Sequence, residues 1–377
     1  MPICNYHKIR KGFFPMANDR IFNFSAGPSM LPLEVLNRAA AEITNYKGSG
    51  MSVMEMSHRS KVYQGIFDET QEKFRKLMGV PEGYKVLFLQ GGATMQFAMV
   101  PMNLMTKTGK ADYVRTGNFA NAAHKEAKKY GEANVAGSSE DRKWAYIPTQ
   151  DQLTLDPNAS YLHYCSNNTI EGTQWQYVPE APAGVPLVCD MSSDIMSRPV
   201  DVSKYGLIYA GAQKNLAPAG LTIAIIKEDL AGNEMPFTPA IMSYKNMIEK
   251  DSMYNTPPCW PIYMLGLMCD WVESVGGTAG IEQLNIKKAN MLYECLEGSK
   301  LFQLAADKDS RSFMNVTFRT GNDELDAKFA SEAGKKGFSN LKGHRSVGGM
   351  RASIYNAMPI EGVEALCDFI REFEKNA

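Results

Sequence analysis

A single lysine stands in a loop of small residues between two apolar runs of the chain. The stretch reads YAGAQKNLAPAGLTIAII over residues 209–226, and the lysine is Lys214. An isolated lysine is by default a surface residue. This loop of Gly, Ala and Pro is tight and poor in water, however, and a desolvated lysine loses proton affinity and becomes a usable nucleophile. Lys214 is therefore a candidate for covalent chemistry.

A pair of glycines follows another apolar run. Gly91 and Gly92 come after YKVLFLQ and precede a helix that the sequence predicts from about residue 93. Ala93 and Thr94 then offer backbone N–H groups at a helix N-terminus, an arrangement that suits a phosphate. The alternative is a simple turn, because the words GxxxxGK[ST] and GxGxxG are both absent.

Two further polar residues end strand-like runs. Asp190 closes VPLVCD, either as a helix cap or as a buried anion that must face a cation. Thr169 lies in CSNNTIEG, which is also typical of turns. In open α/β sheets ligands bind at the carboxyl ends of the strands. One ligand carries a matching group for each of these positions, and it is pyridoxal 5′-phosphate. It has a phosphate for the glycine loop, an aldehyde for Lys214, a ring nitrogen for Asp190 and a ring oxygen for Thr169.

Histidine and arginine occur together in two similar words, SHRS and GHRS. The pairs are His58 with Arg59 and His344 with Arg345. Coincidence is one explanation, but such donors on Gly- and Ser-bounded loops are what recognition of a dianion requires. Arg351, in GGMRASIYN, is either a surface residue or a bidentate partner for a carboxylate.

Apolar strand-like runs alternate with helical patterns over most of the chain. This order predicts an α/β fold with a mostly parallel sheet covered by helices on both faces. Fewer strands and larger helices after about residue 282 indicate a smaller C-terminal α/β domain. The predicted strands that precede the candidate residues are 84–90, 161–165, 186–190, 205–211 and 221–226.

Composition excludes several classes of protein. A chain of 377 residues suggests two domains, and 40 basic against 41 acidic side chains argue against a nucleic-acid or membrane-surface protein. No apolar run is long enough to span a bilayer. Seven singly placed cysteines show neither zinc spacing nor a disulfide framework, so we expect no metal and a cytoplasmic location. The basic N-terminus is expected to be a flexible extension over residues 1–20, or to reflect a start at Met16.

With these words in hand, the sequence resembles the phosphoserine aminotransferase family, which comprises PLP-dependent transaminases of fold type I, class V. The similarity runs from FNFSAGPSMLP to NAMPIEGVEALCDFIREFE and includes MEMSHRS, VLFLQGGATMQF, AGAQKNLAPAGLT, MYNTPP and GHRSVGGMRASIYNAMP. It implies an aspartate aminotransferase-like fold. We expect residues 33–282 to form the large PLP-binding domain and residues 21–32 with 283–377 to form the small domain.

The resemblance implies a role for each matching residue. Lys214 and Asp190 would be catalytic, as the covalent attachment point of the cofactor and the partner of its ring nitrogen. The implied cofactor contacts are Ala93, Thr94, Phe119, Thr169, Asp190, Ser192, Gln213, Lys214, Asn255 and Thr256. The implied substrate contacts are His58, Arg59, His344, Arg345 and Arg351. Asn255, Thr256 and the first His-Arg pair would come from a partner subunit, so a homodimer with shared active sites is expected.

The implied reaction converts 3-phosphohydroxypyruvate and L-glutamate to O-phospho-L-serine and 2-oxoglutarate, in L-serine biosynthesis. Some family members also use a phosphorylated hydroxythreonine in pyridoxine synthesis, and that alternative stays open. The chain departs from the family pattern in two places. Phe119 replaces the Trp of many relatives, and Ala93-Thr94 replace the Gly-Arg of some. Both changes predict weaker cofactor binding rather than a different activity.

Other functions remain as alternatives. An alanine–glyoxylate aminotransferase or a cysteine desulfurase would share the fold, but the first has no use for two His-Arg words and the second needs a cysteine on an exposed loop. A non-catalytic phosphate binder would tolerate loss of Lys214. A dinucleotide oxidoreductase would need a GxGxxG turn, which the chain lacks.

Overall fold

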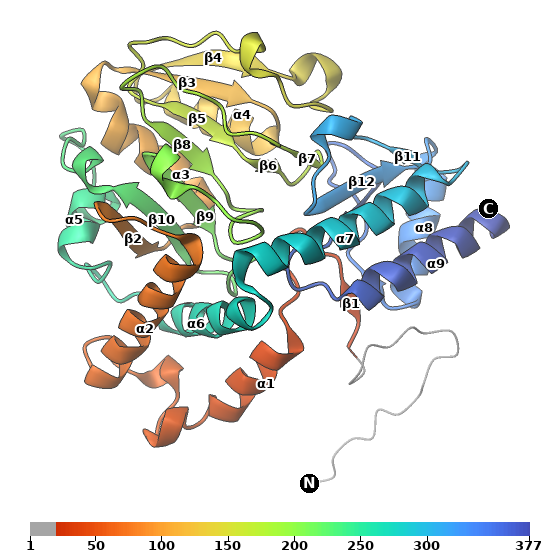
Figure 1. Cartoon of the computed structure of the whole chain (residues 1–377), viewed down its shortest axis with the longest axis horizontal. Coiled ribbons are helices and arrows are strands. Elements are labelled where there is room, and N and C mark those ends of the chain that lie inside the picture. The colour runs from red at the N-terminus through yellow and green to blue at the C-terminus, as the bar shows by residue number, and fades with distance from the viewer. Residues whose placement is uncertain (1–19) are drawn as a thin grey trace.

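The computed structural model describes residues 20–377, so the predicted N-terminal extension, apart from its last residue, and Met16 lie outside the described residues. A seven-stranded sheet is built from strands that lie between residues 84 and 227 (Figure 1). Its strands, in spatial order, are β2 (Tyr84–Leu89), β10 (Thr222–Lys227), β9 (Leu207–Gly211), β8 (Leu187–Asp190), β5 (Leu162–Cys165), β3 (Lys110–Arg115) and β4 (Glu132–Ser138).

Every strand of this sheet except β10 runs in the same direction. Neighbours from β9 to β4 run parallel, whereas β10 is antiparallel to both β9 and β2. The prediction of an α/β fold with a mostly parallel sheet is confirmed. The reversal of β10 matters for the site, because the Lys214 loop thereby joins two adjacent strands of opposite direction and turns back at the sheet edge.

Helices cover both faces of the sheet, which is why its strands are apolar on both sides. On β10, Ile223 and Ile225 belong to one core with α1, α2 and α6, while Ala224 and Ile226 belong to another with α3, α4 and α5. The helices are α1 (Leu33–Glu42), α2 (Lys61–Met78), α3 (Gly92–Leu104), α4 (Asn118–Ala127), α5 (Tyr244–Glu249) and α6 (Cys259–Ser274). Among residues 20–377, no helix is both long and apolar enough to cross a membrane.

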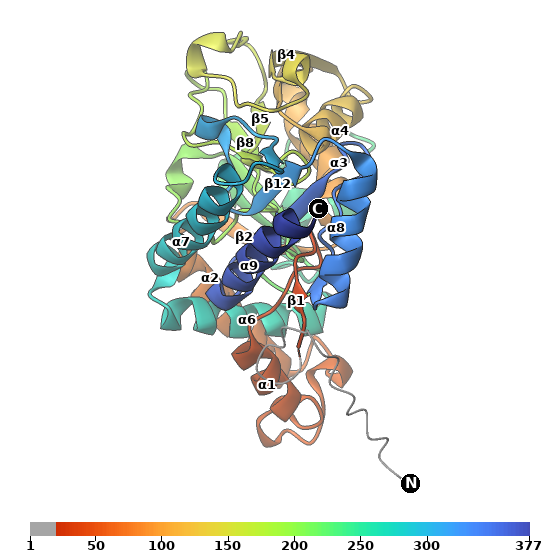
Figure 2. The ribbon, with the colours of Figure 1, turned by 90° about the vertical axis from the view of Figure 1, so that its right-hand side faces the viewer.

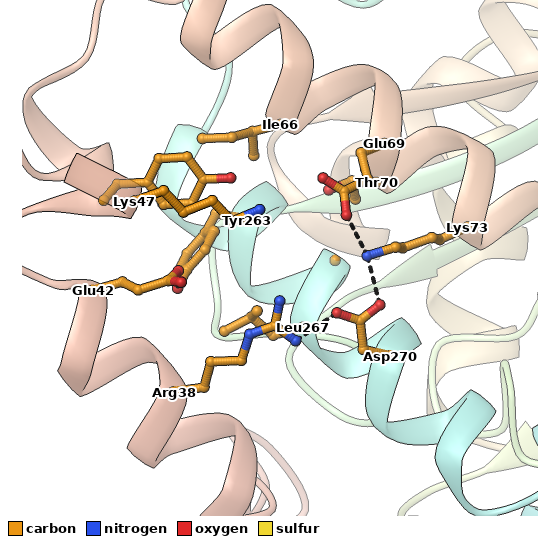
Figure 3. A pocket seen from close by; sticks show the side chains of 12 residues that line it. Arg38, Glu42, Lys47, Ile66, Glu69, Thr70, Lys73, Tyr263, Leu267 and Asp270 are labelled. Carbon is orange, nitrogen blue, oxygen red and sulfur yellow. Dashed lines mark hydrogen bonds and ion pairs between the residues drawn. The ribbon is translucent and has the colours of Figure 1, made fainter. Parts of the chain in front are cut away.

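A cluster of charged side chains joins α1, α2 and α6 outside the first core (Figure 3). Lys73 pairs with Glu69 at 2.6 Å and with Asp270 at 2.5 Å, and Arg38 also pairs with Asp270 at 2.6 Å. The cavity that these residues line measures about 20 Å³, which is room for a water molecule only. We interpret the cluster as structural, because its charges are paired among themselves.

A second core lies between a smaller sheet and three long helices (Figure 2). The helices are α7 (Gly277–Glu297), α8 (Asp323–Lys335) and α9 (Ile360–Asn376). The strands are β1 (Phe22–Asn23) and β13 (Phe338–Ser339), which pair in parallel, and β11 (Gln303–Leu304), β12 (Asn315–Arg319) and β14 (Met350–Ser353), which form an antiparallel sheet. The beginning of the described chain thus packs with its end.

The division into domains stays a proposal. We propose that residues 21–32 and 283–377 form the small domain and 33–282 the large one. Phe22, Phe24 and Met30 belong to the second core together with α7–α9, and this membership supports the assignment of the N-terminal segment to the small domain.

The second core depends on one aromatic ring at its centre. Phe329 of α8 is fully buried, with ring centroids of Phe302, Phe318, Phe369 and Phe373 at 5.2, 5.8, 5.0 and 5.1 Å. Phe329→Ala should lower the free energy of unfolding by about 3–5 kcal/mol, because it removes the ring and leaves a cavity among four others. Urea unfolding followed by circular dichroism measures the loss.

Phe237→Ala serves as the control for this substitution, since the side chain of Phe237 is 66% exposed. We expect its unfolding midpoint to match the wild type within the usual range for surface changes, about 0.5 kcal/mol. Equal losses in the two variants would contradict the central place of Phe329 in the second core.

Candidate active site

Three of the predicted residues meet at the carboxyl edge of the main sheet. Asp190 is the last residue of β8, and Lys214 follows β9. Thr169 lies between β6 (Asn167–Asn168) and β7 (Thr173–Gln174), a short hairpin that continues from β5. The Lys214 Nζ atom donates a hydrogen bond to Thr169 Oγ1 at 2.7 Å. Residues that are far apart in the sequence therefore form one cluster, because parallel strands end at the same edge.

The surroundings of Lys214 favour its neutral form. Burial lowers the pKa of the Lys214 amine, while the negative charge of Asp190 acts in the opposite direction. The ring of Phe119 lies 5.2 Å from Nζ, measured to its centroid, and closes one side of the site. A lowered pKa leaves a larger fraction of the amine neutral near pH 7, so that it is available as a nucleophile and proton acceptor.

Asp190 is a buried carboxylate with a fixed orientation. The residue is 4% exposed, and its Oδ1 atom accepts a hydrogen bond from Ser192 N at 2.8 Å. Ser192 Oγ in turn accepts from Gly211 N at 3.0 Å. Burial raises the pKa of Asp190, and contacts with Ser192 and the charge of Lys214 lower it. The chain turns after Asp190 without forming a helix, so this carboxylate caps a turn rather than a helix.

The glycine pair after β2 forms an open helix N-terminus. Helix α3 begins at Gly92, one residue before the predicted position, and Gly91 precedes it with a φ of 84°. Gly92 has a φ of 66°. No side chain caps this end of the helix. The first-turn N–H groups, including those of Ala93 and Thr94, are therefore free to bind an anion.

The other predicted cofactor contacts lie near this edge. Gln213 accepts a hydrogen bond from Ser29 N through its backbone oxygen at 2.9 Å. Gln90 Nε2 donates to Thr256 O at 3.1 Å, so the Asn255–Thr256 segment lies beside the residues that lead into α3. Both Asn255 and Thr256 are exposed in the single chain.

Arg351 reaches the cluster from the small sheet. It lies on β14, and its Nη1 atom is 3.4 Å from Thr169 O. Its Nε atom is buried and has no hydrogen-bond partner among the described residues. A buried guanidinium N–H without a partner is costly. Arg351 is thus prepared to bind an anion beside Lys214.

The second His-Arg pair lies near Arg351, whereas the first does not. His344 Nδ1 is 2.7 Å from Ser346 Oγ, and the positive charge of Arg351, after burial, lowers the pKa of His344. Arg345 is exposed on the same loop. His58 and Arg59 lie in the turn before α2 and form no hydrogen bond with the residues of this cluster within the described chain. One chain alone does not bring the two pairs together.

One residue of the site escaped the sequence analysis. Glu171 Oε1 accepts hydrogen bonds from Asn118 N at 2.9 Å and from Asn118 Nδ2 at 2.7 Å, which fixes the first turn of α4 and hence Phe119. Its Oε2 atom is buried and has no hydrogen-bond partner within residues 20–377, and burial raises the pKa of this carboxyl. The word TIEG contains a charged residue between apolar ones, but only the fold shows that it faces α4.

Comparison with known proteins gives consistent results. The model of the aminotransferase class-V family matches residues 21–366. A phosphoserine aminotransferase of Nitrosomonas europaea is 52% identical over 364 residues, covering 95% of this chain and 99% of that protein. The solved phosphoserine aminotransferase from Bacillus circulans subsp. alkalophilus superposes with a TM-score of 0.93 at 48% identity, covering 95% and 99% of the two chains. A PLP-bound phosphoserine aminotransferase from Trichomonas vaginalis gives a TM-score of 0.89 at 38% identity, with coverage of 93% and 100%.

Proposed function

Because this chain belongs to the phosphoserine aminotransferases of class V, we propose that it transfers the amino group of L-glutamate to 3-phosphohydroxypyruvate. The products would be 2-oxoglutarate and O-phospho-L-serine, the reversible step that the resemblance assigns to L-serine biosynthesis. The observation that carries this proposal is the meeting of Lys214, Asp190 and Arg351 at one sheet edge. These three residues provide a nucleophilic amine, a buried anion and an anion binder.

The residues at this edge fit pyridoxal 5′-phosphate, the cofactor of the family. The open N-terminus of α3 suits its phosphate, and the buried carboxylate of Asp190 suits a protonated ring nitrogen. Lys214 is the residue that would hold it covalently, with Phe119 against one side of the ring. When bound, the cofactor supplies an electron-accepting ring that stabilises negative charge at the substrate Cα.

The chain itself supplies binding and proton transfer. The Lys214 amine, when free and neutral, would remove the proton from the substrate Cα as a general base. Once protonated, it would deliver that proton as a general acid to the cofactor carbon that receives the amino group. Thr169 Oγ1 holds Nζ at 2.7 Å and so restricts where the amine lies. Asp190 presents its carboxyl group to the site in a fixed orientation, because Ser192 N donates a hydrogen bond to its Oδ1 atom.

Arginine and histidine account for substrate recognition in this proposal. Arg351 would bind the α-carboxylate that both substrates carry, through its free Nε atom. His344 and Arg345 would bind the distal anion, which is a carboxylate in glutamate and a phosphate in phosphoserine. The pair His58-Arg59 would complete this site from a partner subunit. Whether the phosphohydroxythreonine of pyridoxine synthesis is also accepted is a question for the same assay.

A homodimer is part of the proposal. Met51 and Met54, near His58, are 43% and 56% exposed, and Tyr254, beside Asn255, is 45% exposed. Large apolar side chains exposed beside the proposed partner contacts support burial against a second copy. We also place the protein in the cytoplasm, which suits its described free cysteines.

Cysteine placement supports an aminotransferase over a cysteine desulfurase. Of the six cysteines within residues 20–377, five are buried, and the remaining one, Cys259, is half-buried at the start of α6. Burial also raises the pKa of Cys165, the cysteine at the end of β5, which disfavours the reactive thiolate.

The amino-acid half-reaction tests the proposed function. Purified holoenzyme is mixed separately with O-phosphoserine, L-glutamate or L-alanine, without any keto acid, and absorbance follows conversion of the cofactor to its pyridoxamine form. We expect rapid conversion with O-phosphoserine and L-glutamate and little with L-alanine. Conversion by alanine alone would overturn the role of the His-Arg pairs. A protein that binds no cofactor would overturn the role of Lys214.

Phe119 offers a test of cofactor stacking. The ring is 38% exposed beside Lys214, so a larger aromatic side chain has room there. Phe119→Trp should tighten pyridoxal 5′-phosphate binding by about 2- to 10-fold, because indole adds stacking area and an N–H donor. Titration of the apoprotein with cofactor, followed by absorbance, gives the dissociation constant.

Phe237→Trp is the matched control, since it adds an indole at an exposed position outside the cluster. Its dissociation constant should equal that of the wild type. Weaker cofactor binding by Phe119→Trp than by the control would contradict a stacking role for this position.

A further inference from the structure

A buried lysine outside the active site has no acidic partner. Lys288 of α7 is 2% exposed, whereas its neighbour Lys287 is exposed. Lysine is almost never fully buried without a paired charge, because desolvation of an ammonium is costly. Among residues 20–377, no carboxylate lies within ion-pair distance of Lys288, and burial lowers its pKa to about 7. The groups that offset the cost of burying this amine must therefore be uncharged hydrogen-bond acceptors.

Backbone carbonyl groups surround the amine. Four carbonyl oxygens lie within hydrogen-bond distance of the Lys288 Nζ donors, those of Tyr355 at 2.5 Å, Asn356 at 3.1 Å, Met358 at 3.1 Å and Ile354 at 3.4 Å. All four belong to the turn between β14 and α9, here called the 354–358 turn. Tyr355 has a φ of 20°, which is uncommon for a residue other than glycine. The turn points its carbonyl dipoles at one place, and a positive charge there stabilises it.

The 354–358 turn is connected to both sides of the active site. On one side it continues directly from β14, which carries Arg351. On the other, Asn356 N donates to Asn215 Oδ1 at 3.0 Å, and Asn215 follows Lys214 in the chain. Tyr355 Oη also donates to Ala26 O at 2.7 Å. A shift of this turn would displace the guanidinium and the amine relative to each other.

We propose that Lys288 is a positioning residue for substrate binding, which holds the 354–358 turn so that Arg351 and the Lys214 loop keep their relative placement. This inference rests on the roles proposed above for Arg351 and Lys214. Lys288 itself does not touch the cluster; its contacts are with the turn. Its influence should therefore appear in substrate affinity and in the mobility of the turn.

Three variants and two measurements test this role. Lys288→Met keeps an unbranched side chain one atom shorter than lysine and removes the amine. Lys288→Arg keeps a cationic hydrogen-bond donor, and Lys287→Met changes the exposed neighbour on the same helix. The KM for L-glutamate and kcat are measured on the holoenzymes. Amide hydrogen exchange of residues 350–358 is measured by mass spectrometry on the proteins without substrate.

We expect Lys288→Met to raise the KM for L-glutamate by about 10-fold or more, with a smaller change in kcat, because the hydrogen bonds from Nζ to the turn are lost. Exchange in residues 350–358 should become faster, while segments in the far part of the main sheet, such as β3, keep their wild-type rates. Lys287→Met should match the wild type in both measurements. Lys288→Arg should restore a KM within about 3-fold of the wild-type value.

Other outcomes overturn the proposal. A folded Lys288→Met enzyme with an unchanged KM would do so, as would a raised KM without faster exchange in the turn. If neither Lys288 variant folds, Lys288 serves the fold as a whole and the specific role is wrong. Arg351→Lys is measured in parallel: if its KM is unchanged, the proposed function of Arg351 fails, whereas a raised KM there with no effect at Lys288 rejects only the present inference.

Discussion

Replacement of Lys214 by alanine should reduce amino-group transfer by roughly 1,000-fold or more, because it removes both the covalent anchor and the group that moves the Cα proton. The amine lies in a site where burial lowers its pKa and Thr169 fixes its position at 2.7 Å. Steady-state turnover of L-glutamate with 3-phosphohydroxypyruvate measures the loss. Methylamine added to the variant should recover part of the rate, since a small amine fits the space left by the side chain and moves the same proton.

Lys204→Ala is the control for this substitution, because Lys204 is an exposed lysine on the loop that leads into β9. It should retain wild-type turnover. A Lys214→Ala enzyme that keeps more than about one hundredth of the activity would contradict the proposed role, since the loss of a general base costs at least about 100-fold. If methylamine restores activity while the fold of the variant is unchanged, the role of Lys214 is chemical rather than structural.

The residues that sequence analysis placed in the site share one property. Lys214, Asp190 and Thr169 each follow an apolar run, and the local pattern of the chain marks such strand ends without knowledge of the fold. Once the sheet is predicted to be mostly parallel, their meeting at one edge follows from topology. The start of α3 could be placed within one residue because Gly91 and Gly92 mark it.

Other features depend on contacts that no local pattern reveals. An apolar run such as LTIAII is the same in either direction, so the reversal of β10 is set by its pairing with β2 and β9. Glu171 faces α4 only because the β6–β7 hairpin packs there. Lys288 stands in a helical pattern beside an identical residue, and only the 354–358 turn distinguishes it from Lys287.

The two His-Arg pairs show a third limit of prediction from sequence. Two similar sequence motifs indicate similar chemistry, but they do not indicate that their residues lie close together in the fold. Burial and, after it, the charge of Arg351 lower the pKa of His344, whereas His58 lies in the turn before α2. The role proposed for His58 and Arg59 therefore depends on the proposed interface with a partner subunit, and a pattern within one sequence does not predict such an interface.

Asp190→Asn should lower kcat by about 100- to 10,000-fold while the protein remains folded. The amide keeps the shape of the side chain and an oxygen that accepts the hydrogen bond from Ser192 N, so the turn after β8 is preserved. What is lost is the negative charge that would keep a ring nitrogen protonated, and hence the ability of the ring to accept electrons. Asp201→Asn, which changes an exposed aspartate before β9, should retain full activity.

A second measurement on the apoprotein isolates the electrostatic part of this prediction. The charge of Asp190 raises the pKa of Lys214 against the effect of burial, so its removal must lower that pKa further. The pH at which an amine reagent labels Lys214 should consequently move to lower values in Asp190→Asn and stay unchanged in Asp201→Asn. A lower kcat without this displacement would mean that Asp190 acts through structure. The displacement without a loss of kcat would mean that its charge serves Lys214 and not the ring nitrogen.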